Sequence, residues 1–245
     1  MTLTLRLNRR VGSARRLARS AAAVAWVSCL PLALVAQVGH LPRTSPYEDF
    51  KPGQSLTIAA GLLGVKRDPA GVAPKAGPLL AVRYDIGVGG PAFFFVRYSM
   101  APSERRLLDP AKPAATRLIG TPSVTTHVAD LGLDIALTGQ KTWHRLIPSL
   151  GFGAGVASDF AAPDTGLYKF GTRFSFSYGP GVRYLARNGF QVRFDATNYI
   201  WQYQYPDKYF VKTSDTTSVL SDSRARSVWR GNWGLSTGLS IPLFR

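Results

Sequence analysis

The chain of 245 residues carries 30 basic and 14 acidic residues, a formal net charge of +16. Its mean hydropathy is close to zero, and no second long apolar run follows the one near the N-terminus, which excludes a helical membrane protein. The basic residues are spread along every segment, with no basic helix and no nucleic-acid motif. The charge therefore does not indicate a nucleic-acid partner.

The N-terminal segment has the pattern of a secretory signal peptide. Residues 1–19 hold six arginines and no acid, and residues 21–36 form an almost unbroken apolar run. This run is shorter than the roughly 20 residues that a membrane helix needs, and Pro31 interrupts it. We predict a signal peptide over residues 1–36 with cleavage after Ala36, which leaves 24 basic and 14 acidic residues, a net charge of +10.

Cys29 is the single cysteine and lies inside the predicted signal. An alternative is a lipoprotein signal with Cys29 as the acylated first residue, although Trp26-Val-Ser precedes it instead of the usual leucine-led sequence. Cleavage after Ala36 leaves no cysteine, and the three histidines are scattered along the chain. Neither a metal site nor a cofactor is therefore expected.

Beyond a short lead, residues 37–53, apolar residues recur at every second position. The segment from Trp233 to Leu243 is the clearest case, with Gly, Ser or Pro at most of the intervening positions. We predict strands at 54–66, 77–88, 92–101, 124–138, 147–159, 171–186, 190–205 and 229–243. Long connections (67–76, 102–123, 160–170, 206–228) alternate with short ones (89–91, 139–146, 187–189). This pattern predicts an all-β, eight-stranded antiparallel up-and-down transmembrane β-barrel over residues 54–245, with both termini in the periplasm.

Two short turns fix the register of the strands they join, because paired residues must point to the same face. A three-residue turn at 187–189, with Gly189 in the left-handed conformation of a bulge-type hairpin, pairs Tyr184 with Val192 and Val182 with Phe194. A turn at 89–91 pairs Ile86 with Phe94 and Tyr84 with Val96. Both turns predict one consistent outward face. The first strand alternates poorly, so its register stays open.

The opposite face collects charged residues and glycines. The charged residues are Arg83, Asp85, Arg97, Asp130, Asp134, Arg173, Arg183, Arg193 and Asp195. An eight-stranded barrel has an interior narrow enough for its own side chains to fill, and unpaired charges there are costly. We therefore expect a plugged lumen with a salt-bridge network. The alternative is that several of these charges lie near the barrel ends in water.

Aromatic residues indicate where strands cross the membrane interfaces. We expect girdles formed by Phe174, Phe176, Tyr178, Tyr184, Tyr199, Trp201, Tyr203, Tyr205, Trp229 and Trp233. Pro180 lies inside the sixth predicted strand, where it forfeits a hydrogen bond. We therefore expect a bulge or bend at Gly179-Pro180-Gly181.

The C-terminal segment resembles the β-signal of outer-membrane proteins, with Thr237, Gly238, Ile241 and Leu243 at the matching positions and the final aromatic displaced to Phe244. The chain as a whole resembles the small eight-stranded barrels of the porin-like superfamily. The resemblance implies an exported protein of the outer membrane that the barrel assembly machinery inserts. Outer-membrane lipid and lipopolysaccharide, whose phosphates suit the basic charge, are the expected partners, and a monomer is expected.

Some barrels that this chain resembles modify lipid A with a histidine, a serine and an acid near the outer rim. Here His127 lies between Ser123 and Asp130, but an odd spacing puts His127 and Asp130 on opposite faces of a strand. His144 falls in a predicted periplasmic turn and His40 in the lead. We expect no catalytic residue and a structural or surface-interaction role; the alternatives are a lipid A-modifying enzyme and a narrow passive pore.

Overall fold

The computed structural model describes residues 45–51, 53–162, 164, 166–186 and 190–244. The predicted signal peptide, Cys29 and His40 lie outside these ranges, so the expectations for them stay predictions. Among the described residues, no helix has the length and apolar character needed to cross a membrane.

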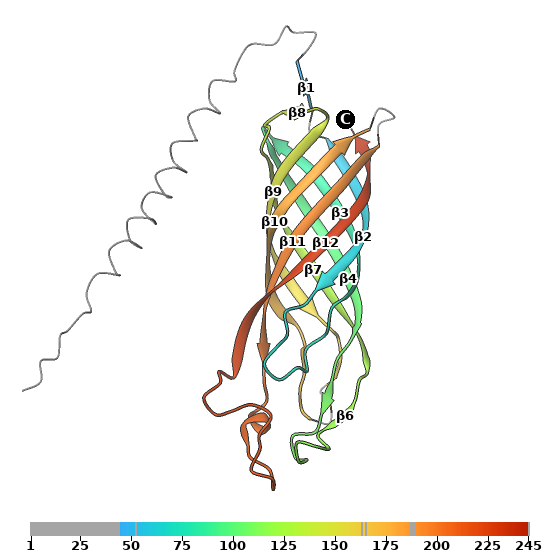
Figure 1. Cartoon of the computed structure of the whole chain (residues 1–245). Coiled ribbons are helices and arrows are strands. Elements are labelled where there is room, and N and C mark those ends of the chain that lie inside the picture. The colour runs from blue at the N-terminus through green and yellow to red at the C-terminus, as the bar shows by residue number, and fades with distance from the viewer. Residues whose placement is uncertain (1–44, 52, 163, 165, 187–189, 245) are drawn as a thin grey trace, which may run out of the picture. The chain divides into compact units, whose positions relative to one another are not determined.

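Eight long antiparallel strands make up the barrel wall in the described part of the chain. They are β2 (Gln54–Gly64), β3 (Gly77–Gly89), β4 (Ala92–Glu104), β7 (Ser123–Ala136), β9 (Leu146–Ser158), β10 (Arg173–Leu185), β11 (Gln191–Gln204) and β12 (Ser227–Phe244). Each strand pairs with the next, and β12 pairs with β2, so the sheet closes (Figure 1). The predicted eight-stranded barrel is confirmed, and each strand end lies within three residues of its predicted position.

Short elements at the barrel ends were not predicted. Strand β1 (Tyr47–Asp49), in the predicted lead, pairs with β8 (Lys141–Trp143), in the connection between β7 and β9. After β4, strand β5 (Leu107–Leu108) pairs with β6 (Leu118–Gly120), and a 3-10 helix, η2 (Asp207–Phe210), follows β11. Hence the lead and two of the long connections carry secondary structure of their own.

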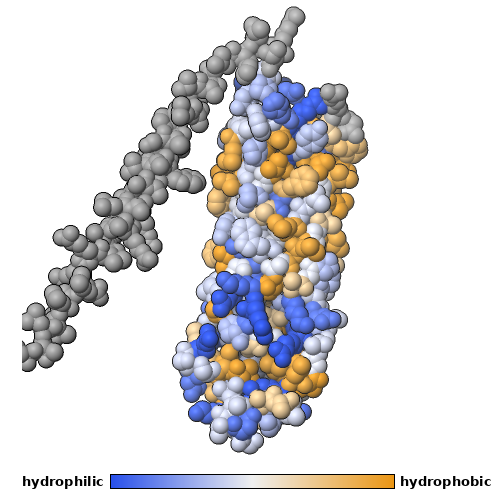
Figure 2. All heavy atoms as spheres, in the orientation of Figure 1, coloured by the Kyte–Doolittle hydropathy of each residue, from blue (hydrophilic) through white to orange (hydrophobic). Residues whose placement is uncertain are grey.

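The two faces of the barrel wall differ because successive side chains of a strand point to opposite sides. Large apolar side chains are exposed on the outward face, among them Ile58, Leu62, Val82, Leu131, Leu133, Phe152, Val156, Phe194, Leu235, Leu239 and Ile241. Figure 2 shows apolar spheres gathered along the upper part of the barrel. Water-soluble proteins rarely expose an apolar surface of this extent, so the wall has the outer face of a membrane-spanning barrel.

The prediction for the aromatic girdles is correct for only some of the residues. The exposed, outward-facing ones are Phe174, Phe176, Tyr178, Tyr184, Trp229 and Trp233. The prediction is wrong for Tyr199, Trp201, Tyr203 and Tyr205, which are only 1–3% exposed. Because Arg193 and Asp195 on the same strand point inward, the two-residue period carries the later odd-numbered side chains inward as well.

Both short turns produce the predicted register. The observed pairs are Ile86 with Phe94 and Tyr84 with Val96 across the first turn, and Val182 with Phe194 and Tyr184 with Val192 across the second. The first turn is tighter than predicted, because Gly89 already pairs with Ala92 and a register shift at 87–89 takes up the extra residue. Gly89 and Gly90 have positive φ angles of 117° and 56°, which glycine adopts without strain. The second turn, including Gly189, lies outside the described residues.

Of the bulge or bend predicted at Pro180, the bulge is absent. Strand β10 keeps one register with β9 through all three residues of Gly179-Pro180-Gly181. Against β11 the register is the same before and after the proline, although the pairs opposite Gly179 and Pro180 are missing from the ladder. Proline has no N–H to donate, and the chain accommodates it by omitting these pairs instead of inserting a residue.

The barrel closes where β2 meets β12, and Gly61 lies at this seam opposite Ser236. A Cβ atom at Gly61 would come within 1.9 Å of the Leu235 carbonyl oxygen. At Gly64, on the same strand, the nearest atom would be 3.5 Å away, an ordinary contact. The close approach of the two backbones therefore requires glycine at position 61.

We expect Gly61→Ala to destabilise the barrel by about 1–3 kcal/mol, as overpacking does, because β2 and β12 must separate to admit a methyl group. Urea unfolding in detergent measures the loss. Gly64→Ala, which has the same effect on the unfolded chain, is the matched control and should unfold at or above the wild-type midpoint. Equal midpoints for the two variants would contradict the close approach.

Candidate functional site

The middle of the barrel interior holds a group of arginines and aspartates, named here the inner charge cluster. Its members are Arg83 and Asp85 of β3, Asp134 of β7, Arg183 of β10, and Arg193 and Asp195 of β11. Their side chains are 13% exposed or less. Each takes an inward position of its strand, and barrel closure brings β3 and β7 to the same place as the neighbouring strands β10 and β11.

Asp134 is the central acceptor of the inner charge cluster. Its Oδ2 atom accepts hydrogen bonds from Nη2 of Arg193 at 2.8 Å, Arg83 at 3.1 Å and Arg183 at 3.3 Å. The remaining ion pairs join Asp85 to Arg83 (2.8 Å), Arg183 (3.1 Å) and, more loosely, Arg193 (3.8 Å), and Asp195 to Arg193 (2.7 Å). Three arginines thus face three aspartates, and the cluster is formally neutral.

A second ion pair lies further along the interior. Arg97 donates from Nε to Oδ1 of Asp130 at 3.0 Å and from Nη1 to Oγ1 of Thr197 at 3.0 Å. Its guanidinium also lies 4.9 Å from the ring centroid of Tyr199. The Phe95 ring separates this pair from the cluster, with the Arg83 guanidinium 3.9 Å from its centroid. Aromatic faces attract cations, so charges and rings alternate along the lumen.

Eight of the nine charged residues predicted for the interior take part in these ion pairs, and Arg173 does not. At the start of β10, Arg173 donates from Nε to the Phe170 carbonyl oxygen at 2.7 Å and from Nη1 to Oε1 of Gln204 at 2.9 Å. It therefore holds the end of the barrel wall to a long loop. The alternative that some of these charges lie near a barrel end applies to this residue.

Little space remains among the interior side chains. A cavity of about 10 Å³ lies between Arg83, Phe95, Arg97 and Asp134 and their neighbours. A volume of this size holds one water molecule at most.

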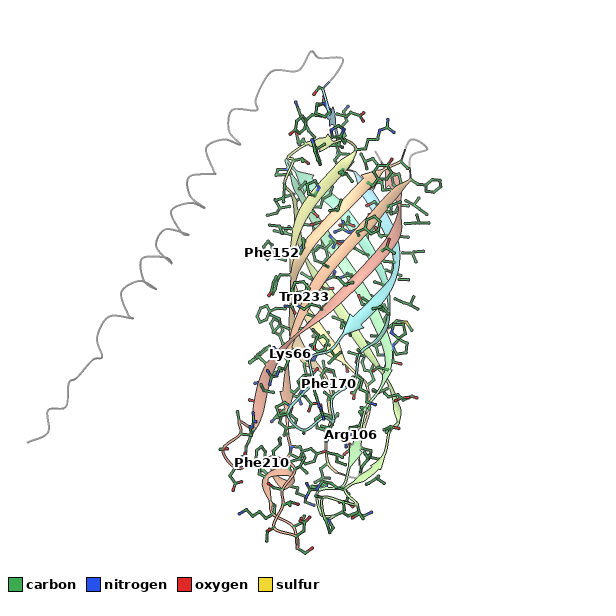
Figure 3. The ribbon with its side chains drawn as sticks, viewed as in Figure 1. Lys66, Arg106, Phe152, Phe170, Phe210 and Trp233 are labelled. Carbon is green, nitrogen blue, oxygen red and sulfur yellow. The ribbon has the colours of Figure 1, made fainter. Side chains whose placement is uncertain are left out.

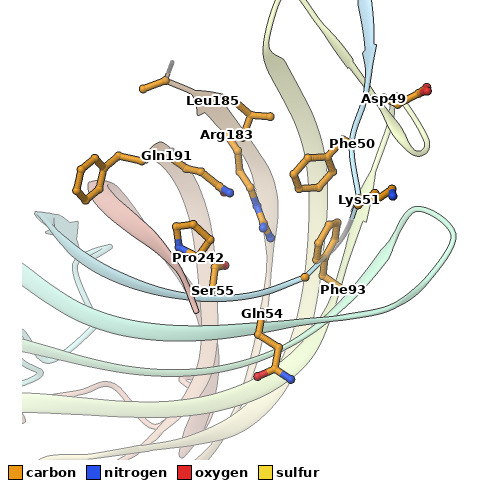
Figure 4. A pocket seen from close by; sticks show the side chains of 13 residues that line it. Asp49, Phe50, Lys51, Gln54, Ser55, Phe93, Arg183, Leu185, Gln191 and Pro242 are labelled. Carbon is orange, nitrogen blue, oxygen red and sulfur yellow. The ribbon is translucent and has the colours of Figure 1, made fainter. Parts of the chain in front are cut away.

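Aromatic side chains cover the lumen at the end with the short turns. Phe50, which follows β1, has its ring centroid 6.1 Å from that of Phe93 on β4, and its backbone N–H donates to the Gln140 carbonyl oxygen at 2.8 Å. Beneath them the Arg183 guanidinium lies 4.4 Å from the Phe93 centroid. Figure 4 shows these side chains around a cavity of about 390 Å³, on whose other side lies Gln191.

The end with the long loops is filled by a second set of rings, named here the outer aromatic cluster. It consists of Tyr168, Phe170, Tyr199, Trp201, Tyr203, Tyr205 and Tyr209, each no more than 3% exposed. Neighbouring ring centroids are 5.8–6.4 Å apart. Figure 3 places Phe170 beyond the apolar band, between the barrel wall and the loop that carries Phe210. The cluster extends the barrel core into the loops.

Polar contacts join the four long loops to one another. They are the Tyr205 hydroxyl to Asp68 (3.1 Å), Arg105 to Asp164 (2.7 Å), Arg117 to the Ser218 carbonyl oxygen (3.0 Å) and the Ala114 N–H to Asp215 (2.7 Å). The strand pattern did not point to these residues, because loop residues carry no periodicity. The one sequence signal for ordered loops is their tyrosine content, because disordered surface segments contain few aromatic residues.

The protonation of the buried loop tyrosines follows from their surroundings. Burial, which disfavours the phenolate, raises the pKa of Tyr168, Tyr205 and Tyr209 above the usual value. The nearby carboxylate of Asp68 raises the pKa of Tyr168 and Tyr205 further. These three hydroxyls therefore stay neutral well into the alkaline range.

Neither His127 nor His144, the two histidines in the described ranges, assembles a catalytic group with its neighbours. The inward side chain of Asp130 lies on the opposite face of β7 from His127. Instead, His127 Nδ1 lies 2.7 Å from the Tyr98 hydroxyl, and its ring centroid is 5.1 Å from that of Phe160. His144, at a positive φ of 48°, lies beside Trp143 in the turn after β8. Among the described residues, no three His, Cys, Asp or Glu side chains are grouped to hold a metal.

The predicted assembly-signal residues lie on β12 at the closing seam. Thr237, Ile241 and Leu243 are exposed on the outward face, and Gly238 pairs with Ala59 of β2. A Cβ atom at Gly238 would come within 2.5 Å of the Ile58 carbonyl oxygen. Close packing between β12 and β2 is thus enough to explain a glycine at this position. Recognition of the segment during assembly stays a prediction.

No protein-family model and no curated protein sequence matches the chain. Similar solved structures include Neisserial surface protein A (12% identity, 81% of this chain and 98% of that chain, TM-score 0.43) and the outer membrane protein AlkL (14%, 84% and 96%, 0.42). The outer membrane protein Ail of Yersinia pestis is 13% identical over 78% of this chain and 100% of that chain, with a TM-score of 0.38. At these values no residue correspondence follows, and the barrel described above rests on the chain's own strand pairing.

We expect Asp134→Asn to destabilise the folded barrel by about 3–5 kcal/mol, because it leaves buried arginines without their shared carboxylate. The free energy of unfolding in urea, measured in detergent, checks this. Asp207→Asn is the control, since its ion pair with Arg226 is largely exposed and exposed pairs contribute little. Similar losses in the two variants would contradict the central role of Asp134.

We expect the loops to open at alkaline pH. Tyr168, Tyr205 and Tyr209 have a higher pKa in the folded than in the unfolded protein. The stability that this difference contributes is complete below about pH 10, the usual tyrosine value, and is lost as the pH rises through the folded-state pKa. Phenolate absorbance during a pH titration checks this. The folded protein should show a late phase of phenolate formation, which should be smaller in Tyr209→Phe and absent after unfolding in urea. A single phase in the folded protein would contradict the raised pKa of these tyrosines.

Proposed function

We propose that this chain is an integral protein of the outer membrane, exported by its N-terminal segment, with a plugged lumen and a structural or surface-interaction role. The supporting observation is the interior, where paired charges leave a cavity of only about 10 Å³. The outward apolar face supports insertion in a bilayer. The short turns then face the periplasm, and the long loops face the exterior.

Closure of both ends supports the same reading over a passive pore. A conducting pore of this fold needs a continuous water path through the barrel. Here Phe50 and Phe93 lie over one end and the outer aromatic cluster fills the other. A solute would have to displace both sets of rings and separate the inner charge cluster.

The outer loops are the surface available for interaction. Because their aromatic core and polar contacts join all four, they form one defined surface rather than separate tethers. The basic excess of the chain favours anionic partners, and lipopolysaccharide is the abundant anion at an outer-membrane surface. Catalysis finds less support, since the proposed base His127 and the acid Asp130 lie on opposite faces of their strand.

We expect the folded protein to give no discrete conductance steps in planar lipid bilayers. As a comparison, Arg193→Ser combined with Asp134→Ser removes one charge pair and leaves the cluster neutral; because the rings at both ends remain, this variant should also give no discrete steps. Slower or faster migration before boiling than after it shows that each preparation is folded. Discrete steps from the wild-type barrel would refute the plugged lumen, and a mature protein soluble in the periplasm would refute the location.

A further inference from the structure

A basic cavity lies among the long loops, apart from the lumen. Its volume is about 270 Å³, and the loop from Val65 to Ala76 forms most of its wall. Arg106, from the next long loop, completes it. Four of its ten lining residues are cations: Lys66, Arg67, Lys75 and Arg106.

Two carboxylates, Asp68 in the cavity wall and Glu104 beside Lys75, are engaged by other groups. Asp68 is 5% exposed and accepts hydrogen bonds from the Val72 and Ala73 N–H groups at 3.3 and 3.2 Å and from Tyr205. Glu104 lies 3.5 Å from Lys75 in an exposed pair. Among the described residues, no carboxylate lies within ion-pair distance of Lys66, Arg67 or Arg106. The four cations outnumber the two carboxylates, Asp68 and Glu104, so the cavity keeps a positive charge.

Hydrogen bonds fix the backbone of the loop that carries most of these cations. The Asp68 hydrogen bonds fix the turn that contains Gly71, whose φ of 70° favours glycine. Arg106 lies across this turn, with Nη1 3.6 Å from the position of a Cβ atom on Gly71. The Lys66 N–H donates to Asn232 of β12 at 3.3 Å. The ordered backbone keeps the bases of these side chains together, so that binding has to order only the side chains themselves.

The cavity also lies at a suitable level for a membrane headgroup. Lys66 lies two residues after the end of β2, and Asn232, its partner, precedes the outward-facing Trp233. In Figure 3 Lys66 lies just below Trp233, and Arg106 lies further into the loops. Figure 2 shows hydrophilic spheres gathered at this level, directly beyond the apolar band.

We propose that this cavity binds a phosphate group, carried by a glycolipid of the outer leaflet or present as a free anion. A guanidinium offers paired N–H donors that match phosphate oxygens, and lysine adds a point charge. The choice of a lipid phosphate rests on the outer-membrane location proposed above. The positive cavity itself does not depend on whether the lumen conducts.

The test uses the full mature chain folded in detergent micelles, with heat-dependent migration as the check of folding. Inorganic phosphate, bisphosphorylated lipid A in mixed micelles and dephosphorylated lipid A in mixed micelles are titrated, and amide NMR shifts of residues 66–76 report binding. Arg106→Gln and Lys66→Gln should each weaken phosphate binding about tenfold, as loss of a charge-assisted hydrogen bond does. Arg224→Gln, which removes an exposed cation outside the cavity, is the matched control and should leave binding unchanged.

The outcomes separate the possible sources of the phosphate. Tighter binding of bisphosphorylated lipid A than of inorganic phosphate, lost on dephosphorylation, identifies a lipid headgroup. Equal affinity for both identifies the free anion. No binding of either probe, or equal weakening by all three variants, overturns the proposal. A barrel that conducts ions but binds phosphate contradicts the plugged lumen alone, and a closed barrel that binds none contradicts this inference alone.

Discussion

The structure depends on one constraint, that a sheet in lipid must satisfy its backbone hydrogen bonds within itself. The pairing of β12 with β2 meets it by leaving no open edge. The seam brings two backbones so close at Gly61 that a methyl group has no room. Closure also gives every strand one face toward lipid and one toward a narrow interior, and the two-residue period assigns each side chain to one of them.

The interior chemistry follows from that assignment. Charged side chains that point inward cannot reach bulk water, so they must find partners across the barrel. Asp134 meets this need for three arginines from three other strands. The rings of Phe95 and Tyr199 against the guanidiniums fill the space between the layers of charge. A core of this kind is stable only while positive and negative charges match in number.

The loops are built by a different rule from the wall. Beyond the membrane the strands no longer face lipid, and the inward tyrosines of β11 meet Tyr168 and Tyr209 from the loops in an apolar core. Hydrogen bonds and ion pairs between loops use the carboxylates of Asp68, Asp164 and Asp215. Cations such as Arg106 are then left without acidic partners. The loops thus expose unpaired basic side chains because their aspartates take part in contacts between the loops.

The sequence by itself determined the barrel, because alternation of apolar and polar residues is local and reports directly on a two-sided strand. It also determined the register across two turns, through the requirement that paired residues share a face. Only the tertiary structure decided that Asp134 accepts hydrogen bonds from three arginines, that Arg173 binds a loop, and that β10 passes Pro180 without a bulge. It also decided that Phe50 covers one mouth and that the loops share a core. These features depend on contacts between residues far apart in the chain, and no period of the sequence encodes such contacts.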